Sequence, residues 1–319
     1  MQFLTNQQTA SHLPFNLLIQ ALEVSFREGC EVPLRHSHSI DAEYGSQNGI
    51  LLLMPAWQPG KRLGVKTVSI FPDNHTRDLP GLHSVFILYD ATTGAPLAIL
   101  DGDVITSRRT AAASALAAKW LSRPDSGTLL VVGAGRVGSL LPEAYRNVRP
   151  IEQVLIWDRN AEAASALAAQ LQAQTVDARA VANLEEAART ADIITCATLS
   201  TEPLILGQWL SPGTHLDLIG GFTPAMRESD DECLRKGSVF IDTTEALLKA
   251  GDILSPISSG AFCEQHVAAT LEQLCRGQHA GRTAAEEITV FKAVGTALED
   301  LAAASLAFDA FQANIAEGQ

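Results

Sequence analysis

Residues 129–138 read Leu-Leu-Val-Val-Gly-Ala-Gly-Arg-Val-Gly, an apolar run followed directly by a Gly-x-Gly-x-x-Gly motif that begins at Gly133. Glycines at this spacing permit a tight turn, a close approach of a phosphate to the backbone, and close packing of the next helix. A second apolar run, residues 154–157, ends at Asp158, about 20 residues after the last glycine. In a dinucleotide-binding βαβ unit, a carboxylate at this place binds the adenosine ribose. The stretch therefore predicts a Rossmann-type domain.

The composition bounds the class of protein. The chain has 319 residues, 46% of them hydrophobic, and a formal net charge of −13. The length favours two domains, and the acidic balance argues against a nucleic-acid partner, which would require a basic face. The amino terminus lacks the features of a secretory signal, and no apolar run is long enough to span a membrane. Five scattered cysteines, an odd number, favour reduced thiols in a cytoplasmic protein.

A His-x-His pair, His36 and His38, is the pattern that most suggests a metal. No cluster of cysteines or carboxylates beside it completes a ligand set, so no bound metal is expected.

The first hundred residues predict an α+β unit. A helix is expected over residues 14–29, where apolar residues recur at three- and four-residue steps. A Gly-containing turn at 92–94 joins two apolar runs and predicts a hairpin. An antiparallel or mixed sheet is expected, with strands at residues 49–57 (ended by Pro55), 63–71, 85–89 and 96–100.

The second half of the chain alternates short apolar runs with helical stretches, the pattern of a parallel sheet with helices on both faces. An Ala-rich helix is expected before it, over Thr110–Leu121, with Arg109 at its opening. Residues 285–308 predict a last helical region that Gly295 interrupts. Pro142 falls inside the helix expected after the glycine motif and should kink it or move its start.

Several stretches, in order along nearly the whole chain, resemble the ornithine cyclodeaminase/μ-crystallin family. The most specific is Arg109-Thr-Ala-Ala ahead of the glycine motif; the others are Gly64-Val65-Lys66, Leu100-Asp101-Gly102, residues 131–138, Ile219-Gly220-Gly221 and residues 289–295. The resemblance implies a Rossmann-type NAD(P)-binding domain at residues 123–289. This domain would be inserted into an α+β substrate-binding and dimerisation domain made of residues 1–122 and 290–319, and the protein would be a homodimer.

The resemblance also implies the substrate and catalytic residues. It makes Lys66 the lysine that faces the substrate, and an ammonium within an apolar strand pattern is costly unless it is paired or used. It places Arg109 between the substrate carboxylate and the cofactor. Independently of the resemblance, a cation at the start of a helix opposes the helix dipole, which suggests an anionic ligand beside Arg109. Arg35 resembles the early arginine that clamps the substrate carboxylate with its fork. Phe222 and Val294 complete the expected substrate contacts, and Lys66 and Arg109 are the expected catalytic residues.

The expected cofactor is NADH or NADPH. Its contacts follow the glycine motif or the ends of strands, where ligands bind in open α/β folds. They are Arg109, Thr110, Gly133, Gly135, Arg136, Val137, Gly138, Asp158, Arg159, Thr198, Leu218, Ile219, Gly220, Val294 and Gly295. Asp158 favours NADH through the ribose hydroxyls, whereas Arg159 can stack on adenine or meet a 2′-phosphate. Both cofactors stay open, and dual use is expected.

Two departures from the family's pattern indicate the reaction. Ornithine cyclodeaminases carry an Asp directly after the Gly-Gly pair and a Lys four residues beyond it, where this chain has Phe222 and Met226. Cyclodeamination and alanine dehydrogenation move protons with that carboxylate, which phenylalanine cannot replace. Reduction of a preformed cyclic imine needs an anchored carboxylate and a C=N held beside the nicotinamide. The chain therefore resembles most the ketimine reductases, which lack the Asp.

These relatives imply reduction of the small cyclic imino acid Δ1-pyrroline-2-carboxylate to L-proline, with the six-membered Δ1-piperideine-2-carboxylate, which yields L-pipecolate, left open. Three alternatives remain: a cyclodeaminase with a displaced acid, an amino-acid dehydrogenase or N-alkylamino-acid-forming enzyme, and a non-catalytic binding protein. The retained Lys66, Arg109 and glycine motif argue against the last. The general acid is not identified; the alternatives are Asp101, Asp103, His83 and water.

Overall fold

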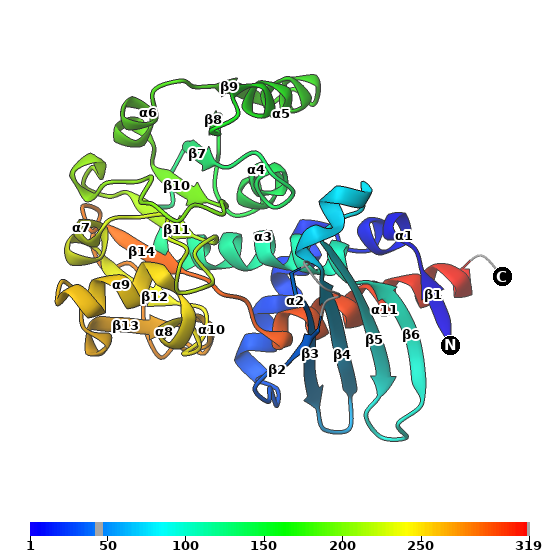
Figure 1. Ribbon diagram of the computed structural model, residues 1–319. Helices are drawn as coiled ribbons and strands as arrows, with labels where there is room; N and C mark the ends of the chain where they lie inside the picture. Colours follow the sequence, from blue (N-terminus) through cyan, green and yellow to red (C-terminus); the bar gives the residue numbers. More distant parts are fainter. Residues whose placement is uncertain (42–46, 318–319) are drawn as a thin grey trace. The chain divides into compact units, whose positions relative to one another are not determined.

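The computed structural model describes residues 1–41 and 47–317. The chain folds into two compact units (Figure 1): Met1–Arg109 with Thr296–Gln319, and Thr110–Gly295. Both junctions differ from the domain limits expected from the sequence, 122/123 and 289/290. The first junction falls inside helix α3, which continues from Gly102 to Leu121 and so belongs to both units.

The first unit is built on a six-stranded mixed sheet in the order β1-β6-β5-β4-β3-β2. Strand β1 pairs with β6 in parallel and the other pairs are antiparallel, which confirms the predicted α+β organisation. The strands are β1 (Gln2–Leu4), β2 (His36–Ile40), β3 (Gly49–Gln58), β4 (Arg62–Ile70), β5 (Leu82–Asp90) and β6 (Pro96–Asp101). Its helices are α1 (Asn6–Ser11), α2 (Phe15–Glu28) and α11 (Ala297–Glu317).

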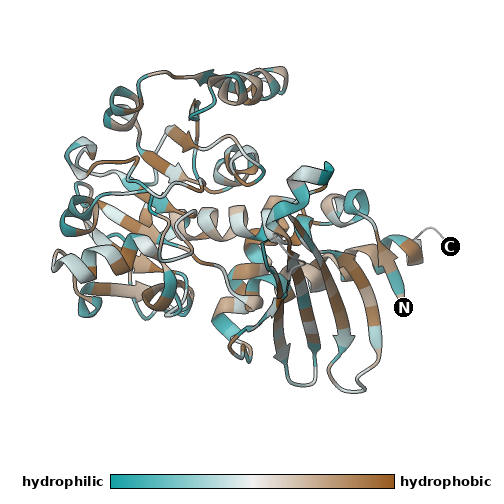
Figure 2. Ribbon diagram, in the orientation of Figure 1, coloured by the Kyte–Doolittle hydropathy of each residue, from teal (hydrophilic) through white to brown (hydrophobic). Residues whose placement is uncertain are grey.

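One face of this sheet forms the core. Alternate residues point to it, as the two-residue period of a strand requires, and Met54, Lys66, Phe86 and Leu100 are paired in one row across β3, β4, β5 and β6. All four are buried. Helix α11 packs on β3, β4 and β5, and α2 packs on α11. Figure 2 shows the apolar residues along these strands. The row therefore places one charged side chain, that of Lys66, in an otherwise apolar layer.

Strand β3 does not end at Pro55, as the sequence predicted, but passes through it. Strand β2 pairs with β3 only as far as Leu53. The nitrogen of Pro55 lies on the side that β2 has left, because the N–H of Trp57, two residues further on, faces that side to bond the carbonyl of Glu31. Proline is tolerated there because no ladder hydrogen bond is lost.

The second unit is built on an eight-stranded parallel sheet in the order β13-β12-β14-β11-β10-β7-β8-β9. Its strands are β7 (Thr128–Val132), β8 (Gln153–Trp157), β9 (Asp177–Ala180), β10 (Ile193–Cys196), β11 (His215–Leu218), β12 (Ser238–Ile241), β13 (Val267–Thr270) and β14 (Thr289–Lys292). Its helices, besides the end of α3, are α4 (Leu141–Arg146), α5 (Ala161–Ala173), α6 (Leu184–Thr190), α7 (Asp231–Lys236), α8 (Ala246–Lys249), α9 (Gly251–Ser259) and α10 (Leu271–Cys275).

The strand order of the second unit reverses between β7 and β10. From β7 the chain proceeds outward to β8 and β9, and it then returns to β10 and continues to β11 on the other side. Because crossovers between parallel strands are right-handed, helices α4 and α5 cover one face and α6 covers the other. Such a reversal opens a crevice at the carboxyl ends of the strands, where doubly wound folds bind dinucleotides. The predicted Rossmann-type α/β fold is confirmed.

Pro142 moves the start of its helix, as expected. A short 3₁₀ turn at residues 138–140 precedes α4, and Pro142 occupies the first turn of this helix, where its missing N–H costs nothing.

Two helical predictions were wrong. Residues 285–308 are not one helical region: Thr289–Lys292 form β14, a fully buried central strand between β11 and β12. Val294 and Gly295 therefore do not break a helix; they lie in the loop between β14 and α11, where Gly295 has a φ of 76°. Helix α3 also begins earlier than predicted, so Arg109 lies in its interior. The dipole of α3 therefore gives no reason to expect an anion beside Arg109.

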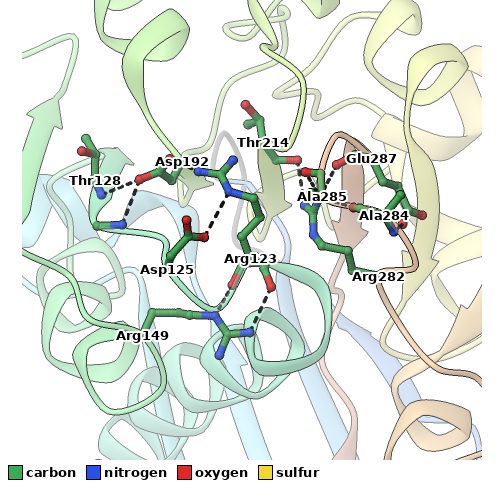
Figure 3. Close-up of polar contacts among 12 residues, drawn as sticks. Arg123, Asp125, Thr128, Arg149, Asp192, Thr214, Arg282, Ala284, Ala285 and Glu287 are labelled. Carbon is green, nitrogen blue, oxygen red and sulfur yellow. Dashed lines mark hydrogen bonds and ion pairs between the residues drawn. The ribbon is translucent and has the colours of Figure 1, made fainter.

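Three arginines close the amino-terminal edge of the parallel sheet (Figure 3). Arg123 pairs with Asp192, with 2.5 Å from Nη2 to Oδ1, and the same aspartate accepts the backbone N–H of Thr128. Arg149 and Arg282 cap the last carbonyls of helix α3, those of Ala118, Lys119, Leu121 and Ser122. Since this edge is filled by structural contacts, the opposite, carboxyl edge is the one available for a ligand.

Along residues 1–41 and 47–317, no helix combines the length and the apolar character needed to cross a membrane.

Candidate active site

The glycine motif forms the loop after β7. Gly133 has a φ of 104°, and a Cβ there would lie 2.7 Å from the carbonyl oxygen of Ala197. A Cβ on Gly138 would collide with the carbonyl of Gly133, whereas a Cβ on Gly135 would meet no atom within 4 Å. Gly133 and Gly138 are thus required by close backbone packing, and Gly135 leaves open space where a phosphate could approach.

A cavity of about 280 Å³ lies at this loop, and it collects predicted cofactor residues from three strand ends. Gly133 and Gly135 follow β7, Asp158 and Arg159 follow β8, and Thr198 follows β10. The cavity therefore occupies the crevice expected at the reversal of strand order.

Asp158 lies at the cavity and is held by the backbone. Its carboxylate accepts the N–H of Ala134, inside the glycine motif, at 2.7 Å and the N–H of Asn160 at 2.8 Å. The neighbouring Arg159 is exposed. Asp158 and Arg159, whose opposite charges favour different cofactors, are thus neighbours in the lining of the cavity.

The ends of β10 and β11 are joined by a carboxylate that the sequence analysis missed. Glu228 accepts hydrogen bonds from the backbone N–H and the hydroxyl of Thr198 (2.7 and 2.8 Å) and from the N–H of Gly220 (2.7 Å). Its side chain is fully buried, and burial raises its pKa to about 7. Leu218 ends β11, and the N–H of Ile219 bonds the carbonyl of Cys196, so these predicted residues lie at the same edge.

A buried ion pair lies beside Glu228. Lys292, at the end of β14, places Nζ 3.0 Å from Oδ2 of Asp252 in α9, and both side chains are fully buried. Oδ1 of Asp252 accepts the backbone N–H groups of Glu228 and Ser229. Lys292 lies within one of the stretches that resemble the family, residues 289–295, but nothing in the sequence indicated a role for it.

Asp242, at the end of β12, holds the loop that carries Val294 and Gly295. Its Oδ2 accepts the N–H of Val294 at 2.7 Å and that of Gly295 at 2.6 Å. Phe222, also expected at the substrate, lies in the loop after Gly221 and is 43% exposed. Both predicted contacts are thus presented from loops at strand ends.

In the first unit, Lys66 is buried and paired. Nζ lies 2.6 Å from Oδ2 of Asp300 in α11 and donates to the hydroxyl of Thr106 at 3.1 Å. Burial lowers the pKa of Lys66 to about 8, with the charge of Arg109 acting in the same direction and that of Asp300 against it. An ammonium has three N–H donors, so one remains for a ligand.

Arg109 shares the same carboxylate. Nε donates to Oδ1 of Asp300 at 2.9 Å and Nη1 donates to Glu299 at 2.7 Å. The paired carboxylates keep the pKa of Arg109 above its ordinary value although burial opposes this. Within residues 1–41 and 47–317 no acceptor bonds Nη2, so this nitrogen can still bind an anion.

The other predicted residues are Arg35, Arg136, Val137 and Thr110. Arg35 is half-buried and directly precedes β2; the register of β2, continued by one residue, puts it opposite Met54, which pairs with Lys66. Arg136 is exposed and Val137 half-buried beside the glycine loop, and Thr110 lies in α3. The structure brings together Lys66 with Arg109 in the first unit, and separately the cofactor residues in the second. A site that combines both sets stays a prediction.

The comparisons with known proteins concern the chain as a whole. The family model of the ornithine cyclodeaminase/mu-crystallin family matches residues 1–314. An uncharacterized protein of Schizosaccharomyces pombe is 49% identical over 96% of both chains. A Delta(1)-pyrroline-2-carboxylate reductase of Colwellia psychrerythraea is 38% identical, covering 95% of this chain and 97% of the relative.

Among solved structures, the Delta(1)-pyrroline-2-carboxylate reductase of Thermococcus litoralis, in complex with NADH and L-proline, is similar over 98% of both chains, with a TM-score of 0.91 and 34% identity. Fold, motifs and full-length similarity lead to one conclusion: the chain belongs to the ornithine cyclodeaminase/mu-crystallin family.

Proposed function

We propose that this protein is an NAD(P)H-dependent reductase of a cyclic ketimine carboxylate, converting Δ1-pyrroline-2-carboxylate to L-proline. The observation that carries the proposal is Phe222. It stands directly after Gly220-Gly221, where a cyclodeaminase of the family would carry an acid, and its ring is 43% exposed. An exposed apolar ring at this place suits a substrate ring and offers no carboxylate for the proton transfers of ammonia release.

The cofactor part of the proposal rests on the second unit. The glycine loop leaves room at Gly135, and Asp158 lines the same cavity. When bound, the nicotinamide supplies the hydride. These residues fit a dinucleotide: backbone N–H groups for the pyrophosphate and a carboxylate for ribose hydroxyls.

The catalytic part rests on Lys66 and Arg109. Each of the two cations keeps an N–H donor in addition to those that bond Asp300, Glu299 and Thr106. In the proposal, Nη2 of Arg109 and the fork of Arg35 bind the substrate carboxylate. The remaining N–H of Lys66 is directed at the imine nitrogen. The C=N bond accepts a hydride at carbon and a proton at nitrogen, and the ammonium of Lys66 is placed to hold or supply that proton.

The proposal includes a homodimer in the cytoplasm and use of either NADH or NADPH. The relatives described above support the small imino-acid substrate. Reduction of the six-membered Δ1-piperideine-2-carboxylate belongs to the same proposal, because an exposed Phe222 sets no sharp limit on ring size.

The test is oxidation of NADH and of NADPH with Δ1-pyrroline-2-carboxylate, alongside an ammonia assay with ornithine and NAD⁺. Rapid cofactor oxidation, with proline as product and no ammonia from ornithine, is the expected result. Ammonia and proline from ornithine would mean that another group does the work of the missing acid, and the argument from Phe222 would be wrong.

A further inference from the structure

Glu228 connects two loops that come from neighbouring strands. One of its oxygens, Oε1, accepts both the N–H and the hydroxyl of Thr198, and the other, Oε2, accepts the N–H of Gly220. Thr198 follows β10 and Gly220 follows β11. Backbone bonds from Leu204 and Ile205 to the carbonyl of Glu228 hold the residue itself in place. The buried carboxylate therefore links the two strand ends directly, through hydrogen bonds that are shielded from solvent.

The packing around this bridge leaves no room for a side chain at Gly220 or Gly221. A Cβ on Gly220 would collide with Oε1 of Glu228 and with the carbonyl of Thr198, and a Cβ on Gly221 would collide with Oδ2 of Asp252. The Gly-Gly pair, whose first glycine is a predicted cofactor contact, is thus also required by two buried carboxylates that pack against it.

Thr198 transmits this constraint to the cofactor cavity. It lines the cavity together with Gly133 and Asp158. A Cβ added to Gly133 would lie 3.0 Å from Cγ2 of Thr198, so the threonine is packed directly against the glycine loop. A shift of Thr198 would therefore change the wall that faces the dinucleotide.

We propose that Glu228 is a positioning residue for dinucleotide binding: it locks Thr198 and Gly220 in the arrangement that the cofactor requires, without contacting the cofactor itself. The inference rests on the proposed use of a nicotinamide cofactor, because the cavity is its predicted site. It adds Glu228, a buried carboxylate bridge, to the glycine motif and Asp158 as a residue on which cofactor binding depends.

The charges around Glu228 make a neutral variant informative. The Lys292–Asp252 ion pair lies beside it, and the buried thiol of Cys196 is also near. Glu228→Gln leaves that ion pair intact and adds no unpaired charge. The amide, however, must turn its NH₂ toward either Thr198 or Gly220, where a donor then faces an N–H donor. One of the two loops loses its anchor in either orientation.

The experiment compares Glu228→Gln with a matched control, Asp217→Asn. Asp217 is another fully buried carboxylate of the same sheet, within strand β11, but its partners are the hydroxyls of Tyr145, Thr195 and Ser114. Hydroxyls can rotate to accept from an amide, and none of these residues lines the cavity. The readouts are Tm, the Kd of NADH by fluorescence titration, and kcat at saturating NADH.

Glu228→Gln is expected to raise the Kd of NADH about tenfold or more, because NADH must then restore an arrangement that a hydrogen bond to a charged group no longer holds. Its kcat at saturating NADH should stay within about threefold of wild type, since the bound cofactor restores the loop. Asp217→Asn should lower Tm without changing the Kd. An unchanged Kd in folded Glu228→Gln, or an equal rise in both variants, would overturn the inference and leave the proposed reductase standing.

Thr198→Val provides a second arm if Glu228→Gln does not fold. It removes the hydroxyl bond to Glu228 and the bond from the N–H of Ser200 to that hydroxyl, but keeps the N–H bond of Thr198 to Glu228 and the shape of the side chain. Because Thr198 is itself a predicted cofactor contact, only the negative result decides here: no rise of the NADH Kd in Thr198→Val contradicts the proposal. If the wild-type protein binds neither NADH nor NADPH, the proposed function fails and this inference fails with it.

Discussion

Lys66 and Asp300 form an ion pair that is almost completely buried, with 2.6 Å between Nζ and Oδ2. The same carboxylate, through Oδ1, binds Nε of Arg109 at 2.9 Å. One aspartate of helix α11 thus fixes two cations that come from strand β4 and helix α3. Because a buried cation is costly without a partner, Asp300 explains how both can remain in the core of the first unit.

Replacing Lys66 by Ala should lower kcat/KM for Δ1-pyrroline-2-carboxylate by about a hundredfold or more, within the range of a lost general acid. Asp300 keeps its bond to Arg109, but the removal of one buried cation should lower stability, so the fold of the variant is checked by Tm. The matched control is Lys61→Ala: Lys61 precedes the same strand but is exposed and pairs with Glu28. A folded Lys66→Ala enzyme that binds cofactor and turns over at the wild-type rate would remove Lys66 from the mechanism.

Replacing Asp300 by Asn leaves Lys66 and Arg109 buried with Glu299 as the nearby carboxylate. Breaking a buried pair from one side destabilises a protein by about 3–5 kcal/mol. We therefore expect a clear fall in Tm by calorimetry. The double variant Lys66→Met/Asp300→Asn restores one cation to one anion and should be more stable than Asp300→Asn alone. A double variant that is no more stable would show that charge balance is not what Asp300 provides.

The activity should depend on pH through Lys66, whose pKa burial lowers to about 8. The group carries its proton below that value and loses it above. If the ammonium is the active form, kcat/KM falls as pH rises through about 8, and Asp300→Asn, which removes the charge that opposes this lowering, moves the fall to lower pH. Lys66→Arg stays charged throughout, so its profile should lose this step. A step that persists in Lys66→Arg must belong to the substrate or another residue.

The sequence predicted those elements that have a local signature. The glycine motif, the strand before it and Asp158 are contiguous or regularly spaced, and the alternation that follows predicts a parallel sheet. Strand β14 was not predicted because it is buried on both faces, which removes the two-residue alternation of apolar and polar side chains. Alanines also dominate the neighbouring sequence, which favoured the prediction of a helix. Helix α3 was predicted too short because Gly102 and Asp103 are poor helix formers; Asp101, whose carboxylate accepts the N–H of Val104, caps the first turn instead.

The missed residues of the site have no local signature at all. Glu228 meets Thr198 across 30 residues, Asp252 meets Lys292 across 40, and Arg109 meets Asp300 across 191. Each is an ordinary acid in the sequence, and only the tertiary fold turns it into a buried partner. A resemblance to a family can supply Lys66 and Arg109, whereas their supporting carboxylates emerge from the packing.

Asp158 should decide between NADH and NADPH. Its carboxylate is held by the N–H groups of Ala134 and Asn160, and a fixed negative charge there favours ribose hydroxyls over a 2′-phosphate. Asp158→Ser should weaken NADH binding about tenfold, the effect of one lost charged hydrogen bond, and weaken NADPH binding less. Arg159→Ala should weaken NADPH selectively, because an exposed guanidinium can meet the phosphate. Fluorescence titration with both cofactors gives the ratio of the two Kd values. A ratio that neither substitution changes would show that the adenosine end of the cofactor is recognised elsewhere.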